Sequence, residues 1–244
     1  MRIAVVSDIH ANLSALEAVV ADLRTTGADL VVQGGDLMAG GARPAEVIDR
    51  VRDLQWPGVY GNAEEMLWAP HIVSERLQAP HLHRIRDLTL TYTIPATRAA
   101  IGEERLAWLR ALPRRWSERD LSVVHAVPDD AWSIVPVSAS DDDLERVYGA
   151  LGSKHVVYGH IHEPFVRRLR AFTVTNSGAA SLSFDGDRRA SYAIIDGDRV
   201  EIRRVDYDVE EEIRLLRSSN DPFAASTAET LRTGRPAPVG EAAP

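Results

Sequence analysis

Short apolar runs alternate with amphipathic segments along the first 60 residues of the chain. Ile3–Ser7 and Asp29–Gln33 are mostly apolar, a pattern typical of strands covered on both faces. Between these runs, residues 13–25 carry apolar side chains three and four positions apart, which predicts an amphipathic helix capped by Asn12 and ended by Gly27.

The same alternation continues to residue 60. Pro44 is suited to the first turn of a second helix that runs to about Leu54, and Gly58–Tyr60 is a short third strand signal. The predicted order is therefore β-α-β-α-β, which is typical of a parallel sheet in an α/β fold.

Residues 64–115 have a different character, because prolines repeatedly interrupt helical patterns there. We expect a helical insertion beside the sheet. Further strands are then predicted at Leu121–His125, His155–Tyr158, Phe165–Leu169, Phe172–Thr175, Tyr192–Ile195 and Val200–Val205. A helix over about 140–150 separates the first two of these strands, and Asp196-Gly197-Asp198 predicts a hairpin.

The C-terminal part of the chain holds one last amphipathic helix, Val209–Leu216. From Asp221 onward the residues are mainly small, polar or Pro, with little to bury. We therefore expect one domain over residues 1–220 and a flexible tail over residues 221–244.

Composition narrows the possible functions. The 28 basic and 36 acidic residues give a formal charge of −8, which argues against a protein that binds nucleic-acid duplexes or anionic membranes through a basic face. The absence of Cys excludes thiolate chemistry and disulfides. With no apolar run near about 18 residues and a carboxylate as early as Asp8, we expect a cytoplasmic protein without a signal peptide or a membrane span.

Polar side chains that bind metals follow the predicted strands. They are Asp8 and His10 after the first strand, Asp36 after the second, Asn62 after the third, His125 after Leu121–Val124, and His160 and His162 after Val156–Tyr158. In open α/β sheets, ligands bind beyond the carboxyl ends of the strands, so these groups would converge there if the strands lie side by side.

Each of these residues has an ordinary interpretation when it is taken alone. Asp8 or Asp36 is typical of a turn or a helix cap, Asn62 after Gly61 is typical of a turn, and a single His125 is typical of packing. The ordinary interpretation must, however, account for seven such coincidences at strand ends, and so we favour a metal centre.

The motifs resemble those of the calcineurin-like metallophosphoesterase family. They are Asp8-x-His10, Gly35-Asp36, Gly61-Asn62, His125 and Gly159-His160-Ile161-His162, and Asn176-Ser177-Gly178-Ala179 resembles the small bacterial and archaeal branch of the family. This resemblance covers about residues 1–216. It implies a four-layer α/β/β/α sandwich of two mixed sheets.

The resemblance also implies a ligand set. One metal ion would be held by Asp8, His10, Asp36 and His162, and a second by Asp36, Asn62, His125 and His160. Imidazole together with carboxylate suits Mn, which we favour, or Fe, Zn, Co or Ni, better than Mg or Ca. Two divalent ions about 3.5–4 Å apart need a bridging carboxylate, Asp36, and a bridging hydroxide that attacks phosphorus in line with the leaving oxygen.

One position departs from the family pattern. Many members have a His after the motif Asn, which is thought to help the leaving oxygen depart, whereas this chain has Ala63. Alanine cannot donate a proton, so we expect the enzyme to favour substrates whose leaving group departs without one, such as an aryl oxide or a phosphate. His71, His81 and His83 in the insertion are either surface residues or replacements for the missing acid.

We therefore expect a dinuclear phosphoesterase that hydrolyses phosphodiesters or phosphoanhydrides of small nucleotide-like substrates. Asp36, Asn62 and His125 would act in catalysis, and Asn62 and His125 would also contact the substrate phosphate. The alternatives are a phosphomonoesterase, including a Ser/Thr protein phosphatase, and a catalytically inactive scaffold. The sequence leaves the physiological substrate, the native metal and the oligomeric state open.

Overall fold

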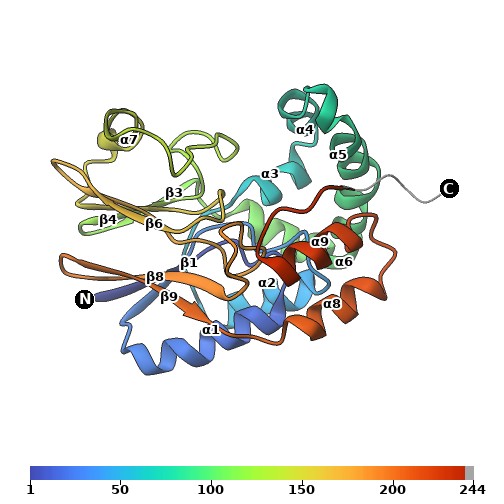
Figure 1. Ribbon diagram of the computed structural model, residues 1–244, viewed down its shortest axis with the longest axis horizontal. Helices are drawn as coiled ribbons and strands as arrows, with labels where there is room; N and C mark the ends of the chain where they lie inside the picture. Colours follow the sequence, from blue (N-terminus) through green and yellow to red (C-terminus); the bar gives the residue numbers. More distant parts are fainter. Residues whose placement is uncertain (240–244) are drawn as a thin grey trace.

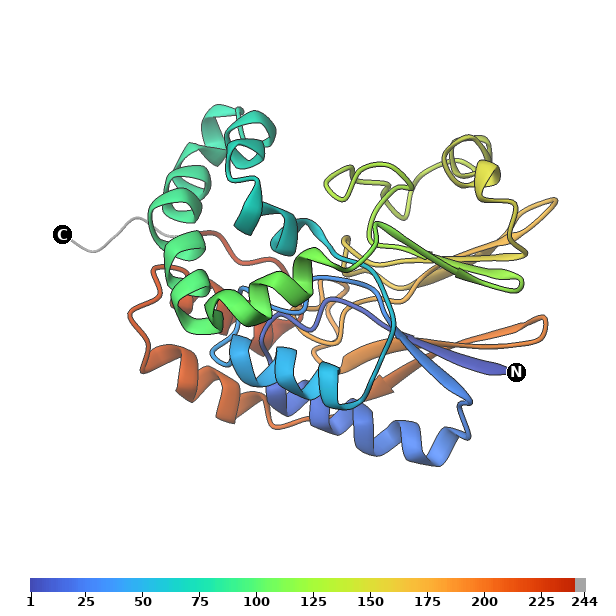
Figure 2. The ribbon, with the colours of Figure 1, turned by 180° about the vertical axis from the view of Figure 1, so that it is seen from behind.

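The computed structural model describes residues 1–239. Two β-sheets face each other, and helices cover the outer side of each sheet (Figure 1). Seen from behind, the helical insertion stands beside both sheets rather than on one of them (Figure 2). Both sheets combine parallel and antiparallel pairs, so the predicted α/β sandwich of two mixed sheets with a helical insertion is confirmed.

The first sheet has the strand order β2-β1-β8-β9. Its strands are β1 (Arg2–Val6), β2 (Leu30–Gln33), β8 (Ala190–Asp196) and β9 (Arg199–Val205). β1 pairs in parallel with β2, where Ile3 lies opposite Leu30, and antiparallel with β8. β8 and β9 form the hairpin predicted at Gly197.

Two helices pack against this sheet. They are α1 (Leu13–Thr26) and α2 (Pro44–Asp53). The side chain of Asn12 caps α1 by accepting the backbone N–H of Ala15 at 2.9 Å. Gly27 ends α1 in the left-handed region, with a φ of 65°. Both helix termini therefore follow from the residues that the sequence places there.

The second sheet has the strand order β3-β4-β5-β7-β6. Its strands are β3 (Arg115–Glu118), β4 (Leu121–Val124), β5 (His155–Tyr158), β6 (Phe165–Arg168) and β7 (Thr173–Asn176). The three central strands are parallel, and the two edge strands are antiparallel to them. Helix α7 (Asp141–Tyr148) and a 3₁₀ turn (Gly149–Leu151) follow β4, and α7 packs on the outer face through Leu144 and Tyr148.

Alternate side chains of the strands enter different layers. Ile3 and Val5 of β1 pack with Leu121, Val123 and Val157 of the second sheet, whereas the residues between them face the helices. Fully burying one such aliphatic side chain contributes about 1.5–3 kcal/mol. This apolar contact holds the two sheets together, so the carboxyl ends of their central strands meet at one edge.

The insertion is helical throughout most of its length. It consists of α3 (Asn62–Trp68), α4 (His71–Arg76), a 3₁₀ turn (Pro80–Leu82), α5 (His83–Leu88), a π-helical turn (Thr89–Thr93) and α6 (Ile94–Arg110). α6 bends at Gly102, whose φ of 71° is left-handed. These helices occupy the segment in which an insertion was expected.

The structure differs from the predicted strands at two places: one predicted strand is absent, and one observed strand was not predicted. Gly58–Tyr60 does not form a third strand and contributes only an isolated bridge between Gln33 and Gly58. Pro57 has no N–H to continue the ladder. β3, in contrast, was not predicted, because its residues are mostly polar and exposed, as an edge strand allows.

The prediction of a loose tail from Asp221 was wrong for residues 224–233. Helix α9 (Ala224–Thr233) packs against α8 (Val209–Arg217) through Ala224, Ala228 and Leu231, which share one face of α9 (Figure 1). Small apolar residues at helical spacing were therefore enough to dock this segment. Residues 240–244 of the expected tail lie outside the described part of the chain.

Candidate metal centre

The seven polar side chains predicted at strand ends converge at one edge of the two sheets. Asp8 and His10 follow β1, Asp36 follows β2, His125 follows β4, and His160 and His162 follow β5. Asn62 is the first residue of α3. Because the two sheets face each other, groups from four strands and one helix meet in a single cluster.

The backbone is strained at most of these positions. Asp8, His10, Asp36, His160 and His162 all have φ between 50° and 67°, the left-handed region that costs a non-glycine residue energy. Such residues persist where hydrogen bonds determine the conformation, and they concentrate at functional sites. Here the N–H of Asp8 donates to Gly35 O at 3.0 Å and that of His10 to Asp36 O at 2.9 Å.

His10 and His162 face each other across one half of the cluster. Their Nε2 atoms are 3.1 Å apart, and Nε2 of His162 lies 3.2 Å from Oδ1 of Asp8. Nδ1 of His10 lies 2.8 Å from the carbonyl of Ala39, and Nδ1 of His162 lies 2.7 Å from that of Leu182. A carbonyl only accepts, so each Nδ1 carries the proton.

In the neutral ring, this tautomer leaves each Nε2 atom with a lone pair and no hydrogen. Two lone pairs and a carboxylate oxygen then point at the same small volume, and the rings cannot hydrogen-bond to each other. A cation placed between them satisfies all three donor atoms, and backbone carbonyls on Nδ1 are the usual outer partners of metal-binding histidines. The residues present therefore fit a metal ion of the transition series.

Asp36 connects the two halves of the cluster. Its Oδ2 lies 3.7 Å from Nε2 of His10, while its Oδ1 lies 3.5 Å from Nε2 of His125. Oδ1 also accepts the N–H of Ala63 at 2.9 Å, which fixes the carboxylate plane. One carboxylate thus presents a different oxygen to each half.

The second half contains His125, Asn62 and His160. Nε2 of His125 lies 3.0 Å from Oδ1 of Asn62, and its Nδ1 lies 2.9 Å from the carbonyl of Gly34. The rings of His125 and His160 have their centroids 5.1 Å apart. The backbone N–H of His160 donates to the Asp8 carboxylate, at 3.1 Å to Oδ2, so the two halves share this contact as well.

Burial and charge shift the pKa values of these groups in different directions. Burial, together with a neighbouring imidazole, lowers the pKa of His10 and brings that of His160 to about 4. Burial would also lower the pKa of His162, but the adjacent Asp8 carboxylate outweighs it and raises the value. Burial opposes ionisation of Asp8, yet His162 lowers the pKa of this carboxyl well below its usual range. The cluster thus favours neutral His10 and His160 next to an ionised Asp8.

Two glycines allow the loops to approach this closely. A Cβ atom at Gly159 would lie 2.2 Å from Oδ2 of Asp8, and one at Gly61 would lie 2.1 Å from Oδ1 of Asp36. Real Cβ atoms do not come this near to oxygen. The Gly residues before His160 and Asn62 are therefore required by the positions of the two carboxylates.

Glu64 belongs to the site, although its position in the sequence indicated no role. Its carboxylate is fully buried and accepts the backbone N–H groups of Asp36, Gly61 and Leu37 at 2.7–2.8 Å. Burial and the charge of Asp36 raise the pKa of Glu64 to about 7, but three N–H donors occupy its oxygens and favour the ionised form. The available signal was an acidic residue three positions after Gly61, the spacing of a capping box.

The histidines of the insertion lie apart from the cluster. His71, His81 and His83 are exposed, and Nε2 of His83 bonds to the carbonyl of Gln78 within the insertion. No hydrogen bond or ring contact within residues 1–239 joins any of the three to the seven clustered side chains. The structure therefore does not bring them to the site.

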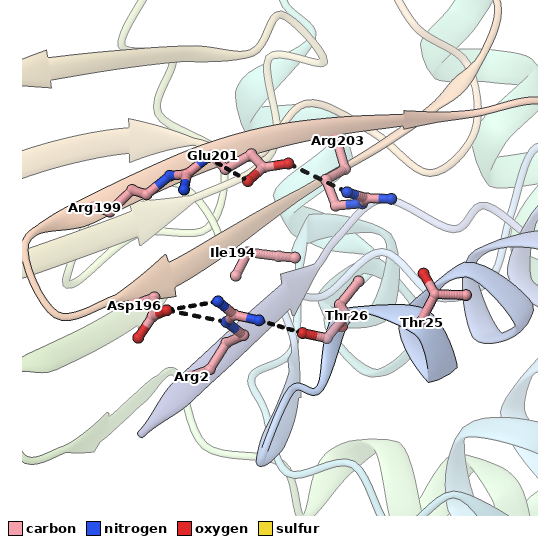
Figure 3. A pocket seen from close by; sticks show the side chains of 8 residues that line it. All are labelled: Arg2, Thr25, Thr26, Ile194, Asp196, Arg199, Glu201 and Arg203. Carbon is pink, nitrogen blue, oxygen red and sulfur yellow. Dashed lines mark hydrogen bonds and ion pairs between the residues drawn. The ribbon is translucent and has the colours of Figure 1, made fainter.

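A separate cavity opens at the opposite end of β1. Its lining includes Arg2, Arg199 and Arg203, but each guanidinium has a carboxylate partner, as Figure 3 shows for Arg2 with Asp196 and for Arg203 with Glu201. These cations are therefore neutralised within the protein. Within residues 1–239, none of the helices combines the length and apolar character needed to cross a bilayer.

Comparisons with known proteins place the chain in a family. The model of the calcineurin-like phosphoesterase superfamily domain matches residues 1–199. An uncharacterised protein of Methanocaldococcus jannaschii is 28% identical over 230 residues, which cover 85% of this chain and 88% of the relative.

The comparison with solved structures gives the same family and fold. The crystal structure of a metallophosphoesterase from Sphaerobacter thermophilus has a TM-score of 0.78 at 28% identity, covering 96% of this chain and all of that one. A hypothetical protein from Pyrococcus horikoshii has a TM-score of 0.76 at 19% identity, covering 97% of this chain and 99% of that one, and shows the fold. The chain belongs to the calcineurin-like phosphoesterase superfamily, close to its small bacterial and archaeal members, and is a metal-dependent phosphoric ester hydrolase.

Proposed function

We propose that the protein is a dinuclear phosphoesterase that hydrolyses phosphodiesters or phosphoanhydrides of small nucleotide-like substrates. The observation that carries the proposal is the arrangement of His10 and His162. Two backbone carbonyls hold both rings in the tautomer that turns the Nε2 lone pairs toward Asp8 and toward each other. While both rings are neutral, these three atoms are all acceptors, and a metal cation between them would satisfy them together.

Two ions would be held by overlapping ligand sets. Asp8, His10, Asp36 and His162 would bind one ion, and Asp36, Asn62, His125 and His160 the other. The support for Asp36 as the shared ligand is that its two oxygens face different halves of the cluster, one toward His10 and one toward His125. Mixed imidazole and carboxylate donors favour Mn²⁺, and Fe, Zn, Co or Ni ions have compatible ligand preferences.

When bound, the ions supply Lewis acidity and an activated water as the nucleophile. The protein supplies the charge balance that attracts the substrate. Among the ligands, Asp8, Asp36 and a hydroxide between the ions would contribute three negative charges against four positive ones, because Asn62 and the imidazoles are neutral ligands. The site therefore keeps an excess of positive charge for a phosphate group, despite the charge of −8 on the whole chain.

Asn62 and His125 would contact the substrate phosphate. Both lie in the second half of the cluster, and the amide oxygen of Asn62 already faces Nε2 of His125. Nδ1 of His125 faces the carbonyl of Gly34, so in the neutral ring its Nε2 and the Asn62 oxygen are both acceptors that a shared ion would satisfy. The amide N–H₂ group of Asn62 then remains as a donor for a phosphate oxygen. Asp36, Asn62 and His125 would thus combine metal binding with orientation of the reacting phosphate.

The preference for diesters and anhydrides rests on Ala63. This residue follows Asn62 in α3, and its side chain offers no proton to a leaving oxygen. The exposed histidines of the insertion do not contact the cluster, so none of these three replaces the missing acid. Aryl oxides and phosphates leave without protonation, whereas alkoxides need it.

Turnover measurements test the proposal directly. The purified protein with added Mn²⁺ is assayed on an aryl phosphodiester, the matching aryl monoester, a cyclic nucleotide and a dinucleoside polyphosphate. We expect the aryl diester and the polyphosphate to be the best substrates, and Asp36→Asn to abolish turnover on both. His81→Ala is the matched control, because this exposed residue lies outside the cluster. A protein that binds Mn²⁺ but hydrolyses none of the four would contradict the proposal.

A further inference from the structure

The C-terminal helical hairpin, made of α8 and α9, lies beyond residue 199, where the match to the family domain ends. We propose that this hairpin positions His10 and His162, and so sets the affinity of one metal ion. The inference rests on the proposed function only for the identity of the ligand. It assigns a role at the metal centre to residues that are outside the matched domain.

The first connection runs through Leu182. Its side chain packs into the apolar cluster of the hairpin, which includes Ile213 of α8 and Leu231 of α9, while its carbonyl oxygen lies 2.7 Å from Nδ1 of His162. Leu182 has a φ of 60°, a conformation that a leucine does not adopt without support. The apolar contact with the hairpin is the support, and the carbonyl that orients His162 depends on it.

The second connection runs through Glu212 of α8. This carboxylate is fully buried, forms an ion pair with Arg43, and accepts the N–H of Ser14 at 3.0 Å. Arg43 in turn donates to Ser14 Oγ at 2.8 Å. Because a buried charge requires its partner, Glu212 anchors the end of the loop formed by residues 39–43.

This loop carries the carbonyl that orients the other histidine. Ala39 O lies 2.8 Å from Nδ1 of His10, and the N–H of Arg43 donates to Ala11 O at 3.1 Å. The loop also lies close to Leu182, because a Cβ atom added at Gly40 would lie only 3.2 Å from Leu182 Cδ1. The two carbonyl-bearing loops therefore run near each other, and each is also joined to the hairpin.

The segment after α9 adds a third contact. The carbonyl of Gly234 accepts the N–H of Gly186 at 2.8 Å. Two residues before Gly186, Phe184 donates its N–H to His162 O at 3.2 Å and stacks on the His162 ring at a centroid distance of 4.5 Å. The C-terminal part of the chain therefore holds His162 from both sides, through Leu182 and through Phe184.

Changing the outer partners of metal ligands costs about 10–100-fold in metal affinity. If the hairpin positions the two histidines, variants within it should show this loss although they touch neither ring. If the hairpin only adds stability to the fold, the folded protein should bind metal normally. These two outcomes distinguish a positioning role from a purely structural one.

Leu231→Ala and Leu182→Ala weaken the apolar contact between Leu182 and the hairpin, and Glu212→Gln weakens the contact with Arg43 and Ser14. Each variant is titrated with Mn²⁺ by calorimetry at a temperature where it is folded. We expect one ion to bind about 10–100-fold more weakly and the other to be little changed. Two matched controls remove similar interactions elsewhere: Leu109→Ala in α6, also buried, and Asp22→Asn, which breaks the ion pair with Arg203. Both controls should bind both ions as tightly as the parent, the protein with the unchanged sequence.

A measurement without metal completes the test. Long-range ¹H–¹⁵N correlation spectra report which ring nitrogen of each histidine is protonated. We expect Nδ1–H for His10 and His162 in the metal-free parent and in both controls, and a mixture of tautomers in the three hairpin variants. A variant that unfolds is replaced by Leu231→Val, which keeps part of the contact.

The possible results separate the two proposals. If the parent binds no Mn²⁺, the proposed function fails, and the tautomers of the metal-free protein still decide the role of the hairpin. If the parent binds Mn²⁺ and the hairpin variants match it in both affinity and tautomer, the positioning role is overturned. Equal losses in the hairpin variants and the controls would overturn it too, because they would indicate a general effect of stability.

Discussion

Glu64 Oε2 accepts the backbone N–H of Asp36 at 2.8 Å, and the same oxygen accepts the N–H of Gly61 at 2.7 Å. The other carboxylate oxygen accepts the N–H of Leu37. One buried side chain thus joins the loop that carries Asp36 to the start of the helix that carries Asn62. The spacing between these two candidate ligands depends on it.

Replacing Glu64 should therefore weaken metal binding without removing a ligand. Glu64→Ala leaves three buried N–H groups without acceptors, each costing about 1–3 kcal/mol. Glu64→Gln keeps one oxygen as an acceptor but turns an amide donor toward a third N–H. We expect Mn²⁺ affinity, measured by calorimetry, to fall about 10–100-fold in Glu64→Gln and further in Glu64→Ala.

Glu65→Gln is the matched control for this experiment. Glu65 is the adjacent buried carboxylate, but it accepts from Trp132 Nε1 at 2.9 Å and pairs with Arg114, away from the cluster. Its replacement should leave Mn²⁺ affinity unchanged. Equal affinity in Glu64→Ala and the parent would show that Glu64 does not hold the two loops at their working distance.

The convergence of the candidate ligands was predictable because these residues stand at strand ends. Buried strands are recognisable from continuous apolar runs, as in Ile3–Ser7, and the polar residue after each run lies at the edge of the sheet. Asp8, Asp36 and His125 could therefore be expected in one place before any contact was known. The pairing of the two sheets came from the resemblance to the family.

The residues that the sequence did not indicate act through backbone groups or weak patterns. Glu64 binds N–H groups of Asp36 and Leu37, which lie 28 and 27 positions earlier, and no side-chain pattern reports such a contact. α9 buries few apolar residues, Ala228 and Leu231 among them, in a segment that is otherwise small or polar, so the segment resembled a tail. Leu182 supplies only its carbonyl to His162, a role that any residue type could have.

Asp36→Asn should remove both metal ions, whereas His10→Ala should mainly weaken one. The reason is that the two oxygens of Asp36 face different histidines, and its negative charge offsets the repulsion between the ions. Elemental analysis of the purified variants measures the metal content. An Asp36→Asn protein that retains two ions would contradict the assignment of Asp36 as the shared ligand.

Metal occupancy should depend on pH because protons compete for the imidazoles. The carboxylates of Asp8 and Asp36 outweigh burial and raise the pKa values of His162 and His125, so these two rings take up protons first as the pH falls. His160, with a pKa of about 4, stays neutral longer. Mn²⁺ affinity should thus be full in alkaline buffer and fall from slightly above pH ~6.5 downward.

Calorimetry and turnover should decline together over this range. Binding near pH ~6.5 should release protons, since His162 and His125 are partly protonated there, and buffers with different ionisation enthalpies measure the number released. Occupancy that stays constant down to about pH 4.5 would argue against imidazole ligands. Loss of turnover at a pH where occupancy is full would instead assign the titration to another group.

The last prediction concerns Ala63, whose N–H holds Asp36 at 2.9 Å and whose side chain is 4% exposed. General acid assistance contributes about 10²–10⁴-fold, and it matters most for poor leaving groups. The native enzyme should therefore cleave aryl diesters and anhydrides much faster than alkyl monoesters. Ala63→His should raise turnover of alkyl esters and leave that of activated substrates nearly unchanged.

Because Ala63 is buried, a larger side chain there can displace its neighbours. Metal content and melting temperature are therefore measured on the same preparation, and Ala63→Phe serves as a control that adds volume but no proton donor. Equal native rates on alkyl monoesters and aryl diesters would show that another acid serves the leaving group, since Ala63 cannot.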